Sequence, residues 1–180
     1  MYLLLIFSFF ISANCFSALP VNIVGKNLMT SQETKVSFLS NEKKGTVVFF
    51  LSTTCPCSIT HFEHFKDLAN RFKNIEFVGI HSNNLENLAD AREVFKQQKA
   101  NFLILQDEKS TLANLFGAVK TPQSYLVDSK GQLQFAGGPT NSSNFKKSSK
   151  KYLEDALLSI SQGKIPDISK SRPLGCSISR

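Results

Sequence analysis

The sequence predicts an α/β fold in which a central mixed sheet is flanked by helices, and three observations support this. Short apolar runs alternate with segments of helical periodicity, as in chains that build parallel strand pairs. Residues 46–51 are apolar on both faces, which is typical of a strand covered by helices on both sides. The turn signal Asp128-Ser129-Lys130-Gly131 separates two alternating runs, which indicates a hairpin and therefore antiparallel strands beside the parallel ones.

The elements are expected in the order β, β, α, β, α, β, α, β, β, α. Strands are expected at residues 35–38, 46–51, 75–80, 102–105, 124–127 and 133–136. Helices are expected at residues 56–72, 85–99, 111–116 and 152–160. Pro56 suits the first turn of its helix, whereas Gly117 and Gly163 follow helix ends.

Helical spacing predicts which side chains of the two longer helices face the core. In the segment 56–72 these are Ile59, Phe62, Phe65, Ala69 and Phe72. In the segment 85–99 they are Leu85, Leu88, Ala89, Val94 and Phe95. Residues 164–180 form a tail without periodicity, and the sequence shows neither an internal repeat nor a domain boundary.

The first 18 residues are expected to be a signal peptide. They carry no charged side chain, and the apolar run at residues 2–11 is too short to span a membrane. Small residues follow it, so cleavage after Ser17 or Ala18 is expected; a retained anchor, or lipidation at Cys15, is the alternative. The sequence thus predicts an exported protein, periplasmic or extracellular, with one domain at residues 19–180 and no stable membrane insertion.

The formal net charge is +7, and the densest basic cluster is at residues 146–151. It comprises Lys146, Lys147, Lys150 and Lys151. A nucleic-acid site would need interleaved aromatic side chains or a known binding module, and neither is present. We expect a solvated helix start or a contact with an acidic membrane surface, and no nucleic-acid partner.

The stretch Thr53-Thr54-Cys55-Pro56-Cys57-Ser58 places two thiols where a strand ends and a helix begins. Amides at a helix N-terminus stabilise an anion, so a thiol there is a better thiolate and a better nucleophile. The hydroxyl groups of Thr53 and Thr54 could donate hydrogen bonds to that thiolate. Without the leader the chain keeps Cys55, Cys57 and Cys176, an odd number, so one thiol is free or serves in exchange.

The pairing of these cysteines stays open at this point. Side chains two apart on a helix point about 200° apart around its axis, so a Cys55–Cys57 bond requires Cys55 to lie outside the helix. Cys176 lies on the tail next to Gly175 and could fold back over the site, so we favour it as the resolving or structural partner. The alternative is that Cys176 is a free surface thiol.

The order of several short motifs gives a resemblance to the thioredoxin fold. The motifs are Phe49-Phe50-Leu51-Ser52-Thr53-Thr54-Cys55-Pro56, Val78-Gly79-Ile80-His81-Ser82, Leu105-Gln106-Asp107, Gly117-Ala118-Val119-Lys120-Thr121-Pro122 and Asp128-Ser129-Lys130-Gly131, followed by a final helix. The tail Gly175-Cys176-Ser177-Ile178 resembles that of a subset of redoxin-domain proteins. The chain is thus similar to exported redoxins, the group that contains alkyl-hydroperoxide-reductase/thiol-specific-antioxidant (AhpC/TSA) and TlpA-like proteins.

The resemblance implies a thiol-based oxidoreductase of the cell envelope that needs no cofactor. Its partners would be protein thiols and disulfides or small hydroperoxides, together with an external thiol reductant. Cys55 would be the nucleophile, with Cys57 or Cys176 resolving the intermediate, Pro122 as a cis-proline beside the cysteines, and Thr54 in the catalytic set. Thioredoxins carry Cys-x-x-Cys and peroxiredoxins carry an upstream proline, whereas this chain has neither, so disulfide and peroxide substrates stay open.

Two other functions stay open beside this one. Cys57, His61 and His64 fall within about 60° of one another on a helix, and Cys55 could add a fourth ligand for copper or zinc. Such a protein would be a non-enzymatic metal binder similar to the Sco-type copper proteins; otherwise His61 and His64 are surface residues. His81, at the end of a strand, is a weaker candidate for a general base. The third function is a redox-inactive interaction module.

Overall fold

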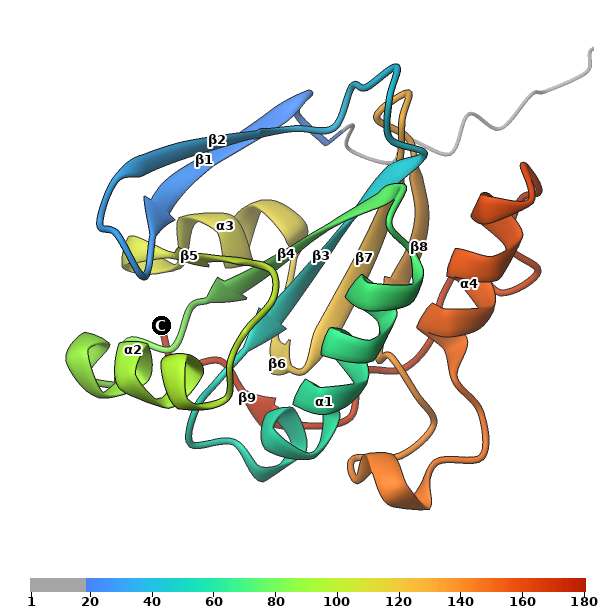
Figure 1. The fold of residues 1–180 in the computed structure, drawn as a ribbon. Helices are drawn as coiled ribbons and strands as arrows, with labels where there is room; N and C mark the ends of the chain where they lie inside the picture. Colours follow the sequence, from blue (N-terminus) through green and yellow to red (C-terminus); the bar gives the residue numbers. More distant parts are fainter. Residues whose placement is uncertain (1–18) are drawn as a thin grey trace, which may run out of the picture.

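The computed structural model describes residues 19–180 as a twisted seven-stranded sheet with helices on both faces (Figure 1). The expected signal peptide, and Cys15 within it, lie outside the described residues. The strands are β1 (Asn22–Asn27), β2 (Glu33–Ser37), β3 (Gly45–Leu51), β4 (Ile75–His81), β5 (Leu103–Gln106), β7 (Gln123–Asp128) and β8 (Leu133–Gly137). The helices are α1 (Pro56–Arg71), α2 (Leu88–Gln97), α3 (Thr111–Phe116) and α4 (Tyr152–Ser161).

The sheet is mixed, as expected, with the strand order β2-β1-β5-β4-β3-β7-β8. Strand β4 runs parallel to both β3 and β5, and the hairpin β7–β8 continues the sheet antiparallel to β3. The predicted turn of this hairpin is present: Asp128 accepts hydrogen bonds from the backbone of Lys130 and Gln132, and Gly131 has a φ of 79°. Left-handed backbone of this kind favours glycine.

Strand β3 is buried along its whole length and divides the core in two. Val47, Phe49 and Leu51 face the cluster that α1, α2 and α4 cover. Val48 and Phe50 face the second cluster, which α3 covers from the opposite side (Figure 1). This arrangement confirms the expectation drawn from residues 46–51, and it brings the end of β3 to the start of α1 in the middle of the sheet.

The predicted inward faces of α1 and α2 are partly wrong. Leu85, Leu88 and Ala89 are exposed, and Ala91 is buried instead, because α2 begins at Leu88 after an Asn87 cap rather than at residue 85. Phe95 is buried as expected, and Val94 is partly buried. The Asn87 side chain accepts hydrogen bonds from the amides of residues 89 and 90, which fixes that start.

On α1, Ile59 is 47% exposed although it was expected to face the core. It lies about 120° around the helix from the fully buried Phe65, whereas Ser58 and Leu68 fall on the buried stripe. The other expected core positions of α1 face inward, with Phe62, Phe65 and Phe72 buried and Ala69 partly buried.

Two pairings were not foreseen. Strand β1 lies between β2 and β5 and pairs antiparallel with both. A second, two-stranded sheet joins β6 (Lys120–Thr121) to β9 (Cys176–Ser177), so the tail that was expected to be irregular carries a strand. Strands of two residues have no periodicity from which they could be predicted.

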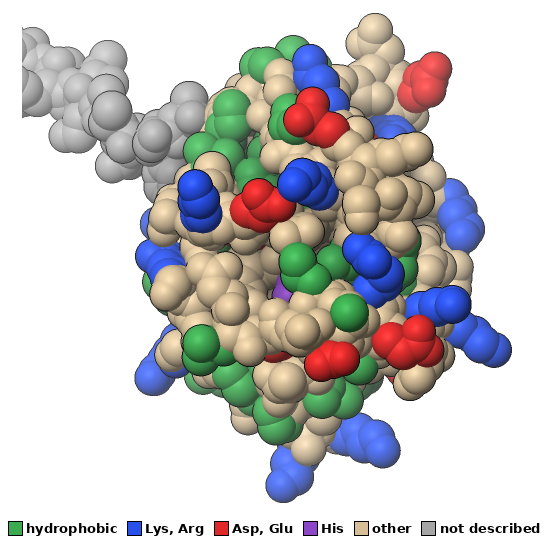
Figure 2. All heavy atoms as spheres, turned by 90° about the vertical axis from the view of Figure 1, so that its left-hand side faces the viewer, with side chains coloured by type: hydrophobic (Ala, Val, Ile, Leu, Met, Phe, Trp, Pro, Cys, Tyr) green, Lys and Arg blue, Asp and Glu red, His purple; other side chains and the backbone are tan. Residues whose placement is uncertain are grey.

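The distribution of charged side chains on the surface can be compared with the partners expected from the net charge. Figure 2 shows lysine, arginine, aspartate and glutamate side chains interspersed over one face, without a continuous basic stripe there. The four-lysine segment begins within the 3-10 helix η2 (Phe145–Lys147), and Lys151 pairs with Glu154 at 3.5 Å. Among residues 19–180 no helix is long and apolar enough to cross a membrane.

Candidate functional site

Cys55 is the residue that caps helix α1. Its backbone is extended (φ −79°, ψ 114°), Pro56 occupies the first helical position, and the Cys55 carbonyl accepts the first helical hydrogen bond, from Ile59. The Cys55 side chain makes no capping bond and is 2% exposed. The sulfur therefore lies at the positive end of α1, which favours a negative charge on it, in a position that is largely shielded from solvent.

Cys55 is disulfide-bonded to Cys176, 121 residues further along the chain. Their Cα atoms are 5.9 Å apart, within the usual range for a disulfide. Of the alternatives that the sequence left open, the structure thus has the tail folded back over the site, and Cys176 is not a free surface thiol. Cys57, at the second position of α1, is unpaired and half-buried.

The tail is held over the site by more than the disulfide. Thr121 pairs with Cys176 and Lys120 with Ser177 in the β6–β9 ladder, and Ile178 donates a backbone hydrogen bond to Val119 at 3.1 Å. The Ile178 side chain is 8% exposed and joins the second core cluster. These contacts dock β9 as an added strand, so they hold Cys176 in register with Cys55.

Gly175 permits this docking because of its position beside β6. A Cβ atom on residue 175 would clash with the carbonyl oxygen of Thr121. Glycine is therefore the residue that lets the tail backbone approach β6 closely enough to pair with it.

The proline expected to be cis is cis: the bond between Thr121 and Pro122 has that geometry. The carbonyl oxygen of Thr121 lies 3.1 Å from the sulfur of Cys55. The segment that carries Pro122 therefore touches both ends of the disulfide, at Cys55 through this carbonyl and at Cys176 through the β6–β9 ladder.

A buried carboxylate, Glu86, anchors the loop that leads into Cys55. Ser52 and Thr53 donate hydrogen bonds to it from their hydroxyl groups, Thr53 also from its amide, and Thr54 donates its hydroxyl at 3.0 Å. Ser52 in turn accepts a hydrogen bond from the Cys55 amide at 3.0 Å. The hydroxyl groups of Thr53 and Thr54 were expected to donate hydrogen bonds to the sulfur, but they donate to Glu86 instead.

The far side of Glu86 is closed by His81 and Asn83. His81 Nε2 lies 3.0 Å from one carboxylate oxygen, and Asn83 donates its amide to the other at 2.6 Å. Burial opposes ionisation of Glu86, but the hydrogen bonds from His81, Ser52 and Thr53 outweigh it and hold the pKa of this carboxyl well below its ordinary value. The carboxylate is charged at neutral pH, and His81 serves it rather than standing free as a base.

Sequence reasoning missed Glu86 because a lone glutamate in the polar loop 83–87 has the pattern of a solvated side chain. The available signal was the run of three hydroxyl residues, 52–54, directly after a buried strand. Three such donors at a buried strand end require an acceptor, since unpaired buried polar groups are costly.

His61 and His64 are buried, so the expectation that they lie on the surface is wrong. His61 is bonded through Nδ1 to the Cys57 carbonyl at 2.8 Å and through Nε2 to Thr140 at 2.9 Å. His64 stacks on Phe145 with 4.3 Å between ring centroids, and burial lowers its pKa to about 4. The loop that carries Thr140 and Phe145 covers this side of α1. Its sequence has no periodic pattern from which this cover could be predicted.

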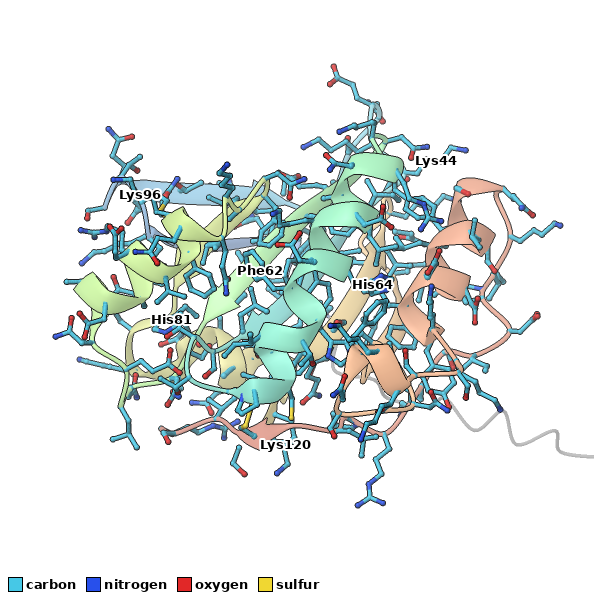
Figure 3. The ribbon with its side chains drawn as sticks, turned by 60° about the horizontal axis from the view of Figure 1, so that its bottom comes forward. Lys44, Phe62, His64, His81, Lys96 and Lys120 are labelled. Carbon is cyan, nitrogen blue, oxygen red and sulfur yellow. A yellow bond between two sulfur atoms is a disulfide. The ribbon has the colours of Figure 1, made fainter. Side chains whose placement is uncertain are left out.

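The proposed ligand set of Cys55, Cys57, His61 and His64 is therefore not brought together. Both nitrogens of His61 are occupied by hydrogen bonds. Within residues 19–180, the cluster of potential ligands that the structure does form is Cys55, Cys57 and Cys176, whose sulfur atoms all lie within 4.8 Å of one another. Figure 3 places the sulfur atoms beside Lys120, at the first turn of α1.

Comparisons with solved structures identify the architecture as thioredoxin-like. An uncharacterised conserved protein from Geobacillus kaustophilus superposes with a TM-score of 0.80 at 21% identity, covering 91% of this chain and 90% of that one. A hypothetical protein from Sinorhizobium meliloti 1021 gives a TM-score of 0.77 at 20% identity, covering 87% and 90%. A secreted Mycobacterium tuberculosis disulfide oxidoreductase homologous to E. coli DsbE gives 0.53 at 16% identity, covering 62% and 79%.

The search of curated proteins finds no match. The family model described as "AhpC/TSA family" matches residues 21–136. The matched region is well over half of the chain and contains the Cys55 junction, the Glu86 cluster and cis-Pro122. The protein therefore belongs to the AhpC/TSA family.

Proposed function

We propose that the protein is a thiol–disulfide oxidoreductase of the cell envelope that alternates between the Cys55–Cys176 disulfide and two free thiols. One observation carries the proposal: a cysteine at a helix N-terminus is bonded to a tail strand docked beside a cis-proline. A purely structural disulfide needs neither a helix N-terminus that stabilises an anion nor a cysteine placed on a tail segment. Export and periplasmic or extracellular location are part of the proposal, supported by the sequence of residues 1–18.

The chemistry follows from the exposure of the two sulfurs. With the disulfide intact Cys55 is buried, whereas Cys176 is half-buried and is the sulfur that an external thiolate can approach. Attack on Cys176 breaks the disulfide, forms a mixed disulfide on Cys176 and releases Cys55 as a thiolate that α1 stabilises. The N-terminus of α1 favours negative charge on this leaving sulfur, so this direction of cleavage is favoured. A second thiol of the reductant then attacks its own sulfur in the mixed disulfide and leaves Cys176 reduced.

In the other half-reaction the reduced Cys55 is the nucleophile. Once the disulfide is open, β9 is held by non-covalent contacts alone, which are hydrogen bonds of the tail and the packing of Ile178, so it can move aside for a substrate. The Cys55 thiolate attacks a substrate disulfide and expels one substrate thiolate. Cys176 then attacks Cys55, restores the internal disulfide and expels the second, so two electrons pass to the substrate.

Disulfide substrates fit the site better than peroxides. Reduction of a peroxide is assisted by hydrogen-bond donors beside the sulfur that stabilise charge on the peroxide oxygens. The hydroxyl groups of the three residues directly before Cys55, which are Ser52, Thr53 and Thr54, are all held by Glu86, and the Cys55 amide is held by Ser52. The AhpC/TSA family match makes hydroperoxide reduction the second candidate.

The deciding experiment is disulfide mapping and trapping. Protein isolated without reductant should contain the Cys55–Cys176 peptide pair by mass spectrometry. Cys176→Ser protein should accumulate mixed disulfides on Cys55 with thiol-containing proteins. Cys55→Ser protein should accumulate far fewer mixed disulfides in total, and Cys57→Ser should retain the native pair. Equal trapping by Cys55→Ser would contradict the proposal, and rapid hydroperoxide consumption by wild type but not Cys55→Ser would favour the second candidate.

A further inference from the structure

Cys57 has no part in the proposed cycle, although its sulfur is within 4.8 Å of both sulfurs of the disulfide. It is half-buried and unpaired, at the second position of α1. In the oxidised protein the cluster is thus one thiol beside a disulfide. After reduction of that disulfide the same three positions present three thiols converging on one point.

Among the His, Cys, Asp and Glu side chains described, those that converge on this point supply sulfur alone. The first turn of α1 has no acidic side chain, and both nitrogens of the neighbouring His61 are taken by the Cys57 carbonyl and Thr140. Thiolates select soft metal ions, above all Cu(I) and Zn²⁺, over the hard cations that carboxylates hold. Structural Zn²⁺ almost always takes four protein ligands, whereas this cluster supplies three, which favours Cu(I).

The geometry also suits three bonds to one ion. Metal–thiolate bonds of about 2.3 Å in a planar trigonal site place the sulfur atoms about 4 Å apart. The present separations are at most 4.8 Å, so the main adjustment is that the bonded pair moves apart. Cys176 lies on the two-residue strand β9, and a small shift of this strand would separate the two sulfurs.

The surroundings favour the negative charge of such a complex. Three thiolates and one monovalent cation carry a net charge of −2. The N-terminus of α1 points its amides at Cys55, and Lys120 reaches over the tail to donate to the Ser177 hydroxyl at 3.0 Å, next to Cys176. The helix N-terminus and the Lys120 ammonium group therefore both offset the negative charge of the three-thiolate complex.

We propose that the reduced protein binds one Cu(I) ion through the thiolates of Cys55, Cys57 and Cys176. A dithiol reductant first takes the disulfide to two thiols and is itself oxidised to a disulfide. Cu(I) then replaces the protons of the three thiols, releasing three protons, with no change in the oxidation state of copper. The site rests on the proposed function only in that the same disulfide must open, and it makes metal binding dependent on the redox state of the tail.

The test is a Cu(I) titration of residues 19–180 under anaerobic conditions, in competition with a chromogenic Cu(I) chelator. Protein reduced with a phosphine and then freed of it should bind one equivalent and show thiolate-to-copper absorption in the ultraviolet. The oxidised protein should show at least a hundredfold weaker binding. X-ray absorption of the complex should show three sulfur neighbours at about 2.3 Å.

Cys57→Ser is the decisive variant because it leaves the proposed redox pair intact. It should weaken Cu(I) binding by a hundredfold or more while the Cys55–Cys176 disulfide still forms and exchanges. His61→Asn, which keeps hydrogen-bonding groups at that position, should bind Cu(I) as wild type does. Unchanged binding in Cys57→Ser, or equal binding by the oxidised protein, would overturn the proposal even if disulfide exchange is normal. A stoichiometric preference for Zn²⁺ over Cu(I) would overturn it as well.

Discussion

At the scale of single residues, Glu86 organises the loop on which Cys55 depends. Its carboxylate receives hydrogen bonds from all three residues that precede Cys55 and from His81 and Asn83. Because Ser52 also accepts from the Cys55 amide, Glu86 acts on the sulfur through Ser52. A site of this kind is precise only while its supporting groups stay charged and bonded.

Replacing Glu86 by Gln should destabilise the protein by about 2–3 kcal/mol at pH 7, since hydrogen bonds to a buried charge are lost. The folded-state pKa of Glu86 lies below its unfolded value. Its contribution is therefore present above the unfolded value and is lost as pH falls, so the difference between wild type and variant should shrink below about pH 4. Urea unfolding at pH 7 and pH 3.5 measures both. Exposed Glu42→Gln is the control, and a difference that grew at low pH would refute the charge argument.

Gly175 is the second residue on which the site depends. In Gly175→Ala the new methyl group meets the Thr121 carbonyl, so β9 should lose its register and the oxidised protein should contain several-fold less Cys55–Cys176 disulfide. Quantitative mass spectrometry after air oxidation measures this fraction. Gly163→Ala is the matched control: residue 163 has a φ of 74° but open space around it, so it should cost about 1 kcal/mol of stability without altering the disulfide. Equal disulfide loss in both variants would contradict the role of close approach.

At the scale of elements, the segments with strong periodicity were predicted and those fixed by tertiary contacts were not. Strand β3 and helix α1 carry long apolar patterns, and the sequence located both. Strands β6 and β9 exist because Gly175 and the docked Ile178 bring two residues of the tail beside two residues of a loop. The loop over α1 that buries His61 and His64 has no pattern either, because its hydrogen bonds run through Thr140 and backbone groups.

The packing of this loop on α1 should make stability depend on pH through His64. Burial keeps its pKa at about 4 when folded, against about 6.5 when unfolded, so the unfolded chain takes up the proton first. Stability should therefore fall between pH 6.5 and pH 4, by up to about 3 kcal/mol. His64→Phe keeps a ring against Phe145 and should remove most of this fall, as measured by urea midpoints across that range. A variant with the same slope as wild type would assign the effect elsewhere.

At the scale of the whole molecule, the site joins three distant parts of the chain: the β3–α1 junction, the cis-proline segment and the tail. The junction was located from the sequence because it combines a buried strand with cysteines at a helix start. The sequence favoured Cys176 over Cys57 as the partner of Cys55 but could not fix the pairing, since the pairing depends on where β9 docks. The cis geometry of Pro122 was predicted from the family resemblance. The role of Glu86 could not be predicted, because it depends on the burial of this side chain and not on its residue type.

The joining of these parts predicts how far the disulfide stabilises the fold. Cys55 and Cys176 close a loop of 121 residues, and loops of that length restrict the unfolded chain enough to stabilise the folded state by about 4–5 kcal/mol. Denaturant unfolding of residues 19–180, with and without reductant, should show a lower midpoint for the reduced form. Cys57→Ser should show the same difference, and Cys176→Ser should show none. An unchanged midpoint for wild type on reduction would contradict this prediction.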